Sequence, residues 1–282
     1  MDIIYFSDKT FFTRLFKRNK FRRPVFYILF KIHRQPWSTI PVVRCFGSLL
    51  ASLSTWLDVW LQKIKHLTPG YLKESDALIF FLKNIVDLPV HAKLFICDAT
   101  AMYTNIDIAH LLHVIKEWLH LHENDLPFEF PKTTILIALE LVMRNNIFEF
   151  GDTYWRQNIG TAMGTPCACI IATIYYAYHE KFYLLPKYKT FLPYYFRFID
   201  DGIGIWSPRT DPNSSLKSAI DSAIQFNEFK ADLNKFGILR WTCEELSNEI
   251  IYLDLIITIN KGKFNFKTYQ KDLNLYLYIP PH

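Results

Sequence analysis

The segment YYFRFIDDGIGIW (194–206) constrains the fold of this chain most, because it places two adjacent carboxylates between two runs of strand-forming residues. Aromatic and β-branched residues favour extended chain, and the Asp201-Gly202 step is typical of a tight hairpin turn. The segment therefore predicts a β-hairpin with Asp200 and Asp201 at its tip.

The two carboxylates allow two interpretations. Asp and Gly dominate hairpin turns for conformational reasons, so an Asp-Asp-Gly step alone indicates a solvated turn. A metal site would need a third carboxylate at another strand end and a surface for phosphates, because two divalent ions need several hard oxygen ligands.

A third carboxylate follows the strand-like run KLFIC (93–97), which ends at Asp98. Shortly afterwards Asp107 can cap a helix whose apolar residues recur at helical spacing from Ile108 to Leu119. If this strand and the 194–206 hairpin are neighbours in one sheet, their ends converge. Converging carboxylates either hold metal ions or have raised pKa values.

The run GTAMGTPCACIIATIYYAYHEKFY (160–183) opens with a loop that contains Gly160 and Gly164. Thr165 as N-cap and Pro166 at the first helical position predict a helix directly after the loop. Glycine permits close backbone approach, and a helix amino-terminus favours anions. The loop is therefore a candidate phosphate contact, whereas the helix body is explained by core packing.

The remaining segments mix helices and strands without a regular βαβ repeat, which predicts an α+β fold with an antiparallel sheet. We expect helices at 49–67, 75–86, 131–146 and 216–236, hairpins at Gly151-Asp152 and Lys261-Gly262, and strands in ILRWTCE and EIIYLDLIITI. The histidines of the 108–119 helix region indicate a solvated face and no metal site, because no Cys or carboxylate completes a ligand set. These histidines are His110, His113 and His120.

Basic residues are unevenly distributed. The segment from Lys9 to Leu57 contains ten Lys or Arg residues and no Asp or Glu, although the net charge of the whole chain is only +5. Because Phe, Tyr and Trp are interleaved with these cations, the segment predicts either a polyanionic partner or a solvated basic tail.

The chain is long and apolar enough to be globular, with 282 residues of which 50% are hydrophobic. The run VFYILF near its start is too short and too closely flanked by Arg23 and Lys31 for a signal sequence or a membrane span. The cysteines form no C-x-x-C pair, so neither a disulfide framework nor a zinc site is predicted. They are Cys45, Cys97, Cys167, Cys169 and Cys243. We expect an intracellular, reducing location, specifically the nucleus, and no membrane contact.

Several segments occur in the order of reverse-transcriptase motifs: DATAMYTNI (98–106), QNIGTAMGTPCACIIAT (157–173), RFIDD (197–201) and IYLDL (251–255). In detail, together with YILFKIH (27–33), YLKESD (71–76), TCE (242–244) and YQKDLNLYLY (269–278), they resemble the Penelope-like retroelements. A single Asp-Asp pair is weak evidence, but the ordered set is specific, and the likeness extends from about Phe26 to the last residue.

The resemblance implies the fingers and palm of a right-hand polymerase, with an antiparallel palm sheet packed on helices and a thumb that is largely absent. The expected organisation is a basic extension (1–25), the first part of the fingers (26–92), and a palm (93–262) with inserted fingers elements at about 107–160. Residues 263–282 would then be the palm end and the start of a truncated thumb.

The activity implied by the resemblance is that of an RNA-directed DNA polymerase, which adds dNTPs to the 3′-hydroxyl of a DNA primer on an RNA template. Asp98, Asp200 and Asp201 would be the catalytic residues and the ligands of two Mg²⁺ ions, or of Mn²⁺ in their place. The backbone carbonyl of Ala99 would complete one coordination shell.

The same resemblance assigns nucleotide contacts. Tyr103 would lie beneath the incoming sugar and exclude a 2′-hydroxyl, while Gln157 and Gly164 would position the template base and the nucleotide. Lys31 would approach the triphosphate. Less specific matches place 252–254 beside the primer end and Lys271 near the thumb.

The chain departs from the family pattern in ways that keep alternatives open. Ile40 stands where a basic residue is usual, with Arg44 or Arg34 as possible substitutes, and Phe198 replaces a tyrosine. A lysine often credited as proton donor has no clear counterpart at 234–241. A truncated or decayed copy that binds nucleic acid with little or no catalysis is therefore the alternative. A polymerase that uses ribonucleotides is a third, against which Tyr103 argues.

Overall fold

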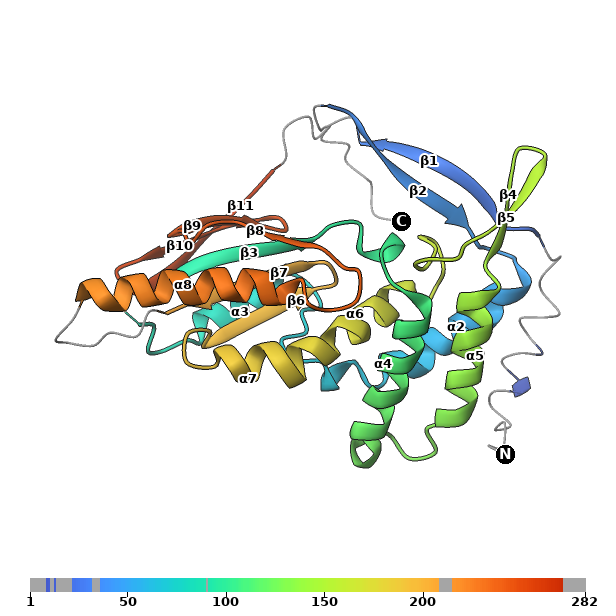
Figure 1. Cartoon of the computed structure of the whole chain (residues 1–282), viewed down its shortest axis with the longest axis horizontal. Helices are drawn as coiled ribbons and strands as arrows, with labels where there is room; N and C mark the ends of the chain where they lie inside the picture. The colour runs from blue at the N-terminus through green and yellow to red at the C-terminus, as the bar shows by residue number, and fades with distance from the viewer. Residues whose placement is uncertain are drawn as a thin grey trace.

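The computed structural model describes residues 9–10, 13, 22–31, 36–89, 91–207 and 215–270, with side chains throughout except at 215–220. The molecule is elongated (Figure 1). A sheet with flanking helices forms one end, and α2 (Leu49–Gln62), α4 (Ile108–Leu121) and α5 (Lys132–Arg144) form the other. The hairpin of β1 (Val25–Lys31) and β2 (Ser38–Arg44) stands above the helices of this second end.

The central sheet has the strand order β6-β7-β3-β8, and all of its neighbours are antiparallel. Its strands are β6 (Tyr194–Phe198), β7 (Asp201–Trp206), β3 (Lys93–Ala99) and β8 (Trp241–Cys243). Strand β3 thus pairs with β7 over the register Lys93↔Trp206 to Asp98↔Asp201. The condition for converging strand ends, that β3 and the hairpin are neighbours, is met.

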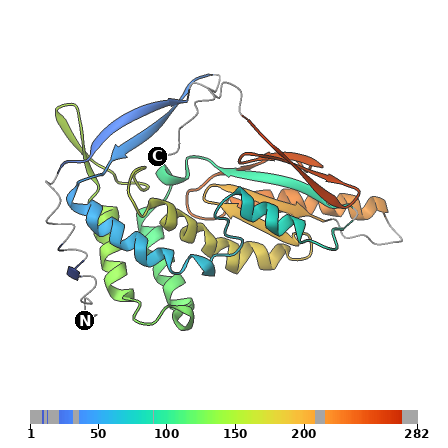
Figure 2. The same cartoon turned by 180° about the vertical axis from the view of Figure 1, so that it is seen from behind.

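Each face of this sheet covers a different hydrophobic cluster, because side chains alternate along a strand. Phe95 and Cys97 of β3 point toward the helical cluster, which includes α2, α4, α5, α6 (Ala168–His179) and α8 (Ser215–Leu233). Leu94 and Ile96 point to the other face, against α3 (Ser75–Lys83) and the small sheet β11-β10-β9. Figure 1 shows α8 in front of the sheet, and Figure 2 shows α3 on the opposite side.

The small sheet consists of β9 (Glu249–Tyr252), β10 (Leu255–Asn260) and β11 (Lys263–Thr268), all antiparallel. A further sheet, β2-β1-β4-β5, includes the hairpin of β4 (Ile147–Phe150) and β5 (Thr153–Arg156), and its β1–β4 contact is parallel. Short elements complete the described chain: α7 (Leu185–Tyr188), a π-helical turn (Glu180–Leu184) and 3₁₀ turns at Lys65–Leu67, Met102–Thr104 and Glu123–Asp125. The prediction of an α+β fold with antiparallel sheets packed on helices is confirmed.

Predictions that depend on residues close together in the sequence were correct for one helix cap and two hairpin turns. The Asp107 side chain accepts a hydrogen bond from the backbone of His110 at 2.7 Å, which caps α4 as predicted. The hairpin turns predicted at Gly151-Asp152 and Lys261-Gly262 are also present. His110 itself is not on a solvated face, because its Nδ1 lies 2.6 Å from the Tyr175 hydroxyl.

Three further predictions were wrong. The turn between β6 and β7 consists of Ile199 and Asp200, so Asp201 and Gly202 belong to strand β7 and not to the turn. Thr165 was predicted to cap α6 and Pro166 to be its first residue, but the helix begins at Ala168. Thr165 and Pro166 precede it, and the Thr165 hydroxyl instead contacts the Cys45 sulfur at 3.5 Å.

The third error concerns the cysteines. Cys97 and Cys243 form a disulfide, although 146 residues separate them. The register places Cys97 of β3 opposite Cys243 of β8, a proximity that spacing in the sequence could not reveal. Within the described ranges, no helix combines the length and apolar character that crossing a membrane requires.

Candidate active site

The turn that carries Asp200 has a specific backbone shape. Phe198 pairs with Asp201 across the hairpin, which leaves Ile199 and Asp200 as a two-residue connection. Ile199 adopts a φ of 53°, a left-handed conformation that is costly for a β-branched residue. Surrounding contacts must therefore hold this turn in place.

The three residues predicted as carboxylate ligands lie at the same end of the central sheet. Asp98 lies directly opposite Asp201 in the β3–β7 register, so the two side chains leave the same face of the sheet. The amide of Ala99 donates a hydrogen bond to the backbone carbonyl of Asp200 at 2.9 Å. The turn is thereby fastened to the residue after Asp98.

Burial and nearby charges shift the pKa of the Asp200 carboxyl in opposite directions. Burial raises the pKa of the half-buried Asp200 carboxyl above its usual value, and the nearby Asp98 raises it further. A hydrogen bond from its own backbone and the cations Lys31 and Arg197 act in the opposite direction. Asp200 therefore lies within electrostatic reach of Asp98 and of Lys31, which ends β1.

Asp201 has a different environment from Asp200. It lines a depression of about 580 Å³ together with Phe198, Lys73 and Asp254. In the same depression the Ser75 hydroxyl donates a hydrogen bond to the Asp254 carboxylate. Over the ranges given above, no three His, Cys, Asp or Glu side chains form a group that could hold a metal ion.

Tyr103 lies close to these carboxylates. It belongs to the 3₁₀ turn Met102–Thr104 after β3, and its hydroxyl is 3.2 Å from the sulfur of Cys169 on α6. Burial raises the pKa of the Tyr103 phenol far above its usual range, and the contact with Cys169 and the charge of Asp200 act in the same direction. The phenol is therefore protonated at neutral pH.

The glycine loop connects Tyr103 to β2 through backbone contacts. The amide of Thr161 donates to the carbonyl of Tyr103 at 2.6 Å, and a Cβ on Gly160 would lie 2.4 Å from that same oxygen. At the other end, the amide of Val43 donates to the carbonyl of Met163 at 2.9 Å. The loop is closely packed against Tyr103 and β2. This packing explains why glycine is needed in the loop, whether or not the loop also contacts a ligand.

Gln157 is held by its neighbours at the base of the β4–β5 hairpin. Its side-chain oxygen accepts from Asn146 at 2.6 Å, and its side-chain nitrogen donates to the carbonyl of Ile159 at 2.9 Å. These bonds orient the start of the glycine loop. They also engage both ends of the Gln157 amide.

The two cations considered as triphosphate contacts lie at opposite ends of the β1–β2 hairpin. Lys31 pairs with Ser38, and Arg44 pairs with Val25, six residue pairs away along β1. At about 3.3 Å per residue, roughly 20 Å separates them. Arg44 is therefore distant from Lys31 along the hairpin. Lys271, Arg34 and most of 1–25 lie outside the described residues.

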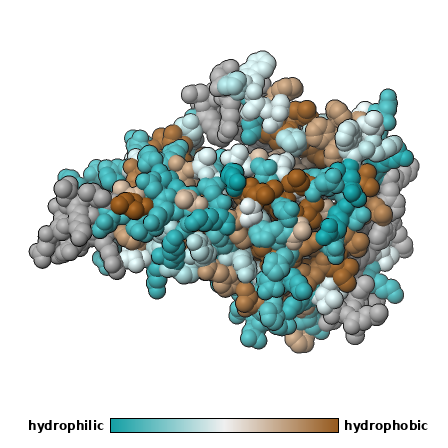
Figure 3. Space-filling view, viewed as in Figure 1, coloured by the Kyte–Doolittle hydropathy of each residue, from teal (hydrophilic) through white to brown (hydrophobic). Residues whose placement is uncertain are grey.

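The described part of the β1–β2 hairpin exposes aromatic side chains, with Lys31 and Arg44 at its two ends. Tyr27, Phe30 and Trp37 are exposed. Figure 3 shows hydrophobic side chains gathered on the half of the molecule that holds α4, α5 and this hairpin, whereas the sheet end is largely hydrophilic. Aromatic faces beside cations suit stacking on unpaired bases.

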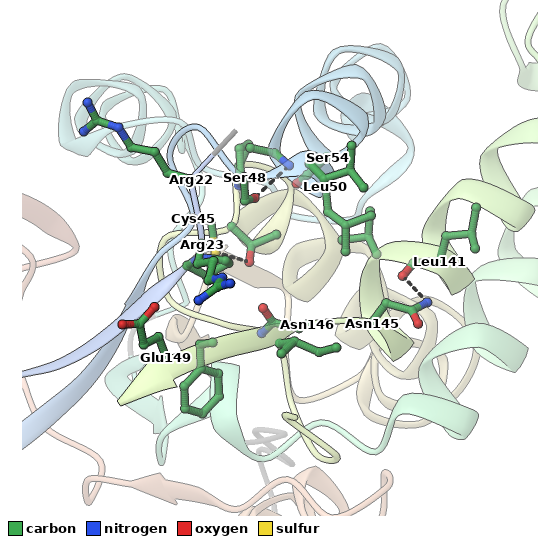
Figure 4. Close-up of a pocket in the computed structure, with 18 of the residues that line it drawn as sticks. Arg22, Arg23, Cys45, Ser48, Leu50, Ser54, Leu141, Asn145, Asn146 and Glu149 are labelled. Carbon is green, nitrogen blue, oxygen red and sulfur yellow. Dashed lines mark hydrogen bonds between the residues drawn. The ribbon is translucent and has the colours of Figure 1, made fainter. Parts of the chain in front are cut away.

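A cavity of about 750 Å³ lies apart from this site, between α2, α5 and β4. Figure 4 shows Ser48, Leu50 and Ser54 on one side of it and Leu141 and Asn145 on another. Its lining includes none of the predicted site residues, although Thr165 at the end of the glycine loop reaches it.

Sequence reasoning missed two groups beside the site. Arg197 lies beneath the Asp200 turn, although the RFIDD motif contains it. Lys73 and Ser75 line the Asp201 depression, and the YLKESD match was the available signal. Both motifs are recognisable in the sequence, but only the fold shows that their residues lie next to Asp200 and Asp201.

No protein-family model matches the chain, and no curated protein matches its sequence. Solved structures of polymerases do match its fold. Telomerase from Candida albicans in complex with the TWJ fragment of telomeric RNA has a TM-score of 0.58 at 12% identity, covering 95% of this chain and 51% of that one. Apo telomerase from Candida tropicalis, truncated from its C-terminal domain, has a TM-score of 0.53 at 16% identity, with 92% and 58% covered.

A viral polymerase is equally similar. The RNA-dependent RNA polymerase of BmCPV in its quiescent state has a TM-score of 0.59 at 12% identity, covering 92% of this chain and 24% of that one. The chain spans about half the length of the telomerases and about a quarter of the viral polymerase. At these identities the likeness concerns the fold alone, and the chain has a reverse-transcriptase-like polymerase fold.

Proposed function

We propose that this chain is an RNA-directed DNA polymerase domain of a Penelope-like retroelement. The observation that carries the proposal is the β3–β7 register, which brings Asp98 beside Asp201 and the Asp200 turn within a reverse-transcriptase-like fold. The matched telomerase is in complex with an RNA fragment, and the matched viral enzyme is an RNA-dependent polymerase. An RNA template and a DNA primer are accordingly the proposed partners.

Asp98, Asp200 and Asp201 would hold the divalent metal ions, with the Ala99 carbonyl as an added ligand. Carboxylate oxygens suit Mg²⁺, and the β3–β7 register with the hydrogen bond from Ala99 to the Asp200 carbonyl puts all three residues at the same end of the sheet. Two bound Mg²⁺ ions, or Mn²⁺, would activate the primer 3′-hydroxyl and neutralise the leaving pyrophosphate.

The remaining residues would position the nucleotide. Lys31, within electrostatic reach of Asp200, would neutralise the triphosphate of the dNTP. The Tyr103 ring would lie beneath the sugar, and Gln157 with the Gly160 to Gly164 loop would shape the site of the template base. In this assignment 26–92 and about 107–160 act as fingers and 93–262 as palm.

Primer extension on poly(rA)/oligo(dT) with Mg²⁺ tests the proposal. We expect incorporation by the wild type and background levels for Asp200→Ala and Asp98→Asn. Asp152→Ala is the matched control, because Asp152 is an exposed carboxylate in the β4–β5 turn, outside the site. Equal incorporation by wild type and Asp200→Ala would refute the assignment.

Nucleic-acid binding with little or no catalysis is the second candidate. The described residues include no group of three ligands placed to hold a metal, and Ile40 removes an expected cation. A salt-dependent affinity for primer-template without incorporation would support this candidate, because phosphate contacts release counterions.

An intracellular, nuclear location is part of the proposal, since the proposed substrates are intracellular. A reducing compartment disfavours disulfides, so the Cys97–Cys243 bond would depend there on the burial of Cys97. Imaging of a fluorescent fusion would test the location.

A further inference from the structure

A buried ion pair lies directly beneath the Asp200 turn. The side chains of Arg197 and Glu180 are 1% and 0% exposed. The pair is bidentate, with Nε to Oε1 at 2.6 Å and Nη2 to Oε2 at 2.8 Å. Removing two charges from water is costly, and well-packed apolar residues often stabilise a core equally well. The pair therefore calls for an explanation beyond stability.

The other donors of this guanidinium supply that explanation. Nη1 donates to the carbonyl of Ile199 at 2.6 Å, and Nη2 donates to the carbonyl of Thr173 on α6 at 2.9 Å. Ile199 directly precedes Asp200 and has the left-handed φ of 53°. Arg197 thus stabilises the strained residue on which the direction of the Asp200 side chain depends, while Glu180 and α6 fix the guanidinium itself.

The backbone of Arg197 connects the turn to a further segment. Its amide donates to the carbonyl of Gly70 at 2.8 Å, and its carbonyl accepts from the amide of Leu72 at 3.0 Å. Gly70 allows this approach, because its φ is +61° and a Cβ there would lie 2.4 Å from the carbonyl oxygen of Tyr195. Residues 70–72 of the YLKESD region, α6 and the turn all meet at Arg197.

We propose that Arg197, oriented by Glu180, is a positioning residue that holds the Asp200 turn in place at the end of strand β3, where Asp98 lies. The consequence for catalysis rests on the proposed polymerase function, whereas the consequence for the turn does not. Arg197 is not a catalytic residue, because its side chain is buried and its guanidinium donates to Glu180, Thr173 and Ile199.

Arg197→Lys is the informative substitution. Lysine keeps a charge for Glu180, but a single ammonium group lacks the planar fork that reaches Glu180, Thr173 and Ile199 together. We expect kcat to fall about tenfold to a hundredfold, as for other small displacements of catalytic groups, with little change in the KM for dNTP. The half-saturating Mn²⁺ concentration, measured by calorimetry without nucleotide, should rise.

A readout independent of catalysis is the hydrogen exchange of the Ala99 amide, which bonds to the Asp200 carbonyl. In Arg197→Lys this amide should exchange about tenfold faster, as expected when one hydrogen bond is weakened. Amides of the small sheet, such as Ile257, should be unchanged.

Two controls separate positioning from stability. Asp232→Asn disturbs another buried carboxylate, 2% exposed and paired with Lys187 and Lys235, so it should lower the unfolding temperature without altering kcat or Ala99 exchange. The double variant Arg197→Met, Glu180→Leu replaces the pair by apolar groups. It should unfold at a higher temperature than Arg197→Met alone and still show fast Ala99 exchange and low kcat.

Return of slow Ala99 exchange in the double variant would overturn the proposal, because the pair would then serve stability alone. Unchanged exchange in Arg197→Lys would overturn it as well. If the wild type extends no primer, the proposed function fails, but exchange at Ala99 still decides whether Arg197 positions the turn.

Discussion

Gly164 approaches the carbonyl oxygen of Val43 so closely that a Cβ on Gly164 would lie 2.3 Å from that oxygen. Its φ of +111° is also one that other residues rarely adopt. Two independent constraints therefore require glycine where the loop meets strand β2.

Gly164→Ala should lower the free energy of unfolding by about 2–4 kcal/mol, because both backbone strain and a steric clash arise. Gly151→Ala is the matched control: its φ is +58°, but no atom lies within 4 Å of the added Cβ. The control should cost only about 1 kcal/mol. Urea unfolding measures both, and equal losses would contradict the close contact with β2.

Tyr103→Ala should increase incorporation of ribonucleotides relative to deoxynucleotides, because removing the ring makes room for a 2′-hydroxyl. We expect at least a tenfold change in the ratio of kcat/KM values, or about 1.4 kcal/mol in discrimination. Tyr103→Phe keeps the ring and should keep the preference. An unchanged ratio in the alanine variant would show that the Tyr103 ring does not exclude the 2′-hydroxyl.

The stability contributed by Asp232 should depend on pH. Burial alone would raise the pKa of Asp232, but hydrogen bonds from Lys187, Lys235 and Tyr188 outweigh it and hold the pKa well below the usual range. A depressed pKa gives stability that is present above the unfolded-state value of about 3.9 and is lost as pH falls through the folded-state value.

Asp232→Asn should accordingly be less stable than wild type at neutral pH, and the difference should shrink as the pH falls below about 4. Urea unfolding at several pH values measures this difference. A difference that is constant with pH would mean that the charge of Asp232 is not what stabilises the fold.

Cys243→Ser should lower the free energy of unfolding by about 2–4 kcal/mol under non-reducing conditions, because the bond to Cys97 closes a long loop. With reductant, wild type and variant should become similar. Cys169→Ser, which changes an exposed free thiol, should have little effect on stability. Alkylation of both Cys97 and Cys243 in unreduced, unfolded protein would show that the bond is absent.

Strand ends and helix starts that depend on neighbouring residues could be predicted from the sequence. The Asp107 cap requires only Asp107 and the amide of His110, and the strand at 93–97 is apolar from Leu94 to Cys97. The location of Asp98 at a strand end followed from these local signals. Its pairing with β7 did not, because any strand of suitable length could have been the neighbour.

The turn register could not be predicted, because it depends on contacts distant in sequence. Asp201-Gly202 is the better turn dipeptide, yet the turn is Ile199 and Asp200, where Arg197 and the amide of Ala99 bind the two carbonyl groups. In the same way, Thr165 contacts Cys45 and does not cap α6. Both errors arise where tertiary hydrogen bonds outweigh local preference.

Each of the two hydrophobic clusters packs against one face of the central sheet. Phe95 belongs to the helical cluster and Leu94 to the cluster with α3 and the small sheet, and both residues are on β3. Loss of either cluster would leave one face of β3 and β7 exposed to water. We therefore expect neither cluster to stay ordered without the other. The two clusters should unfold in a single cooperative transition. The carboxylates at the end of β3 and β7 should then take up their positions only when both clusters are formed.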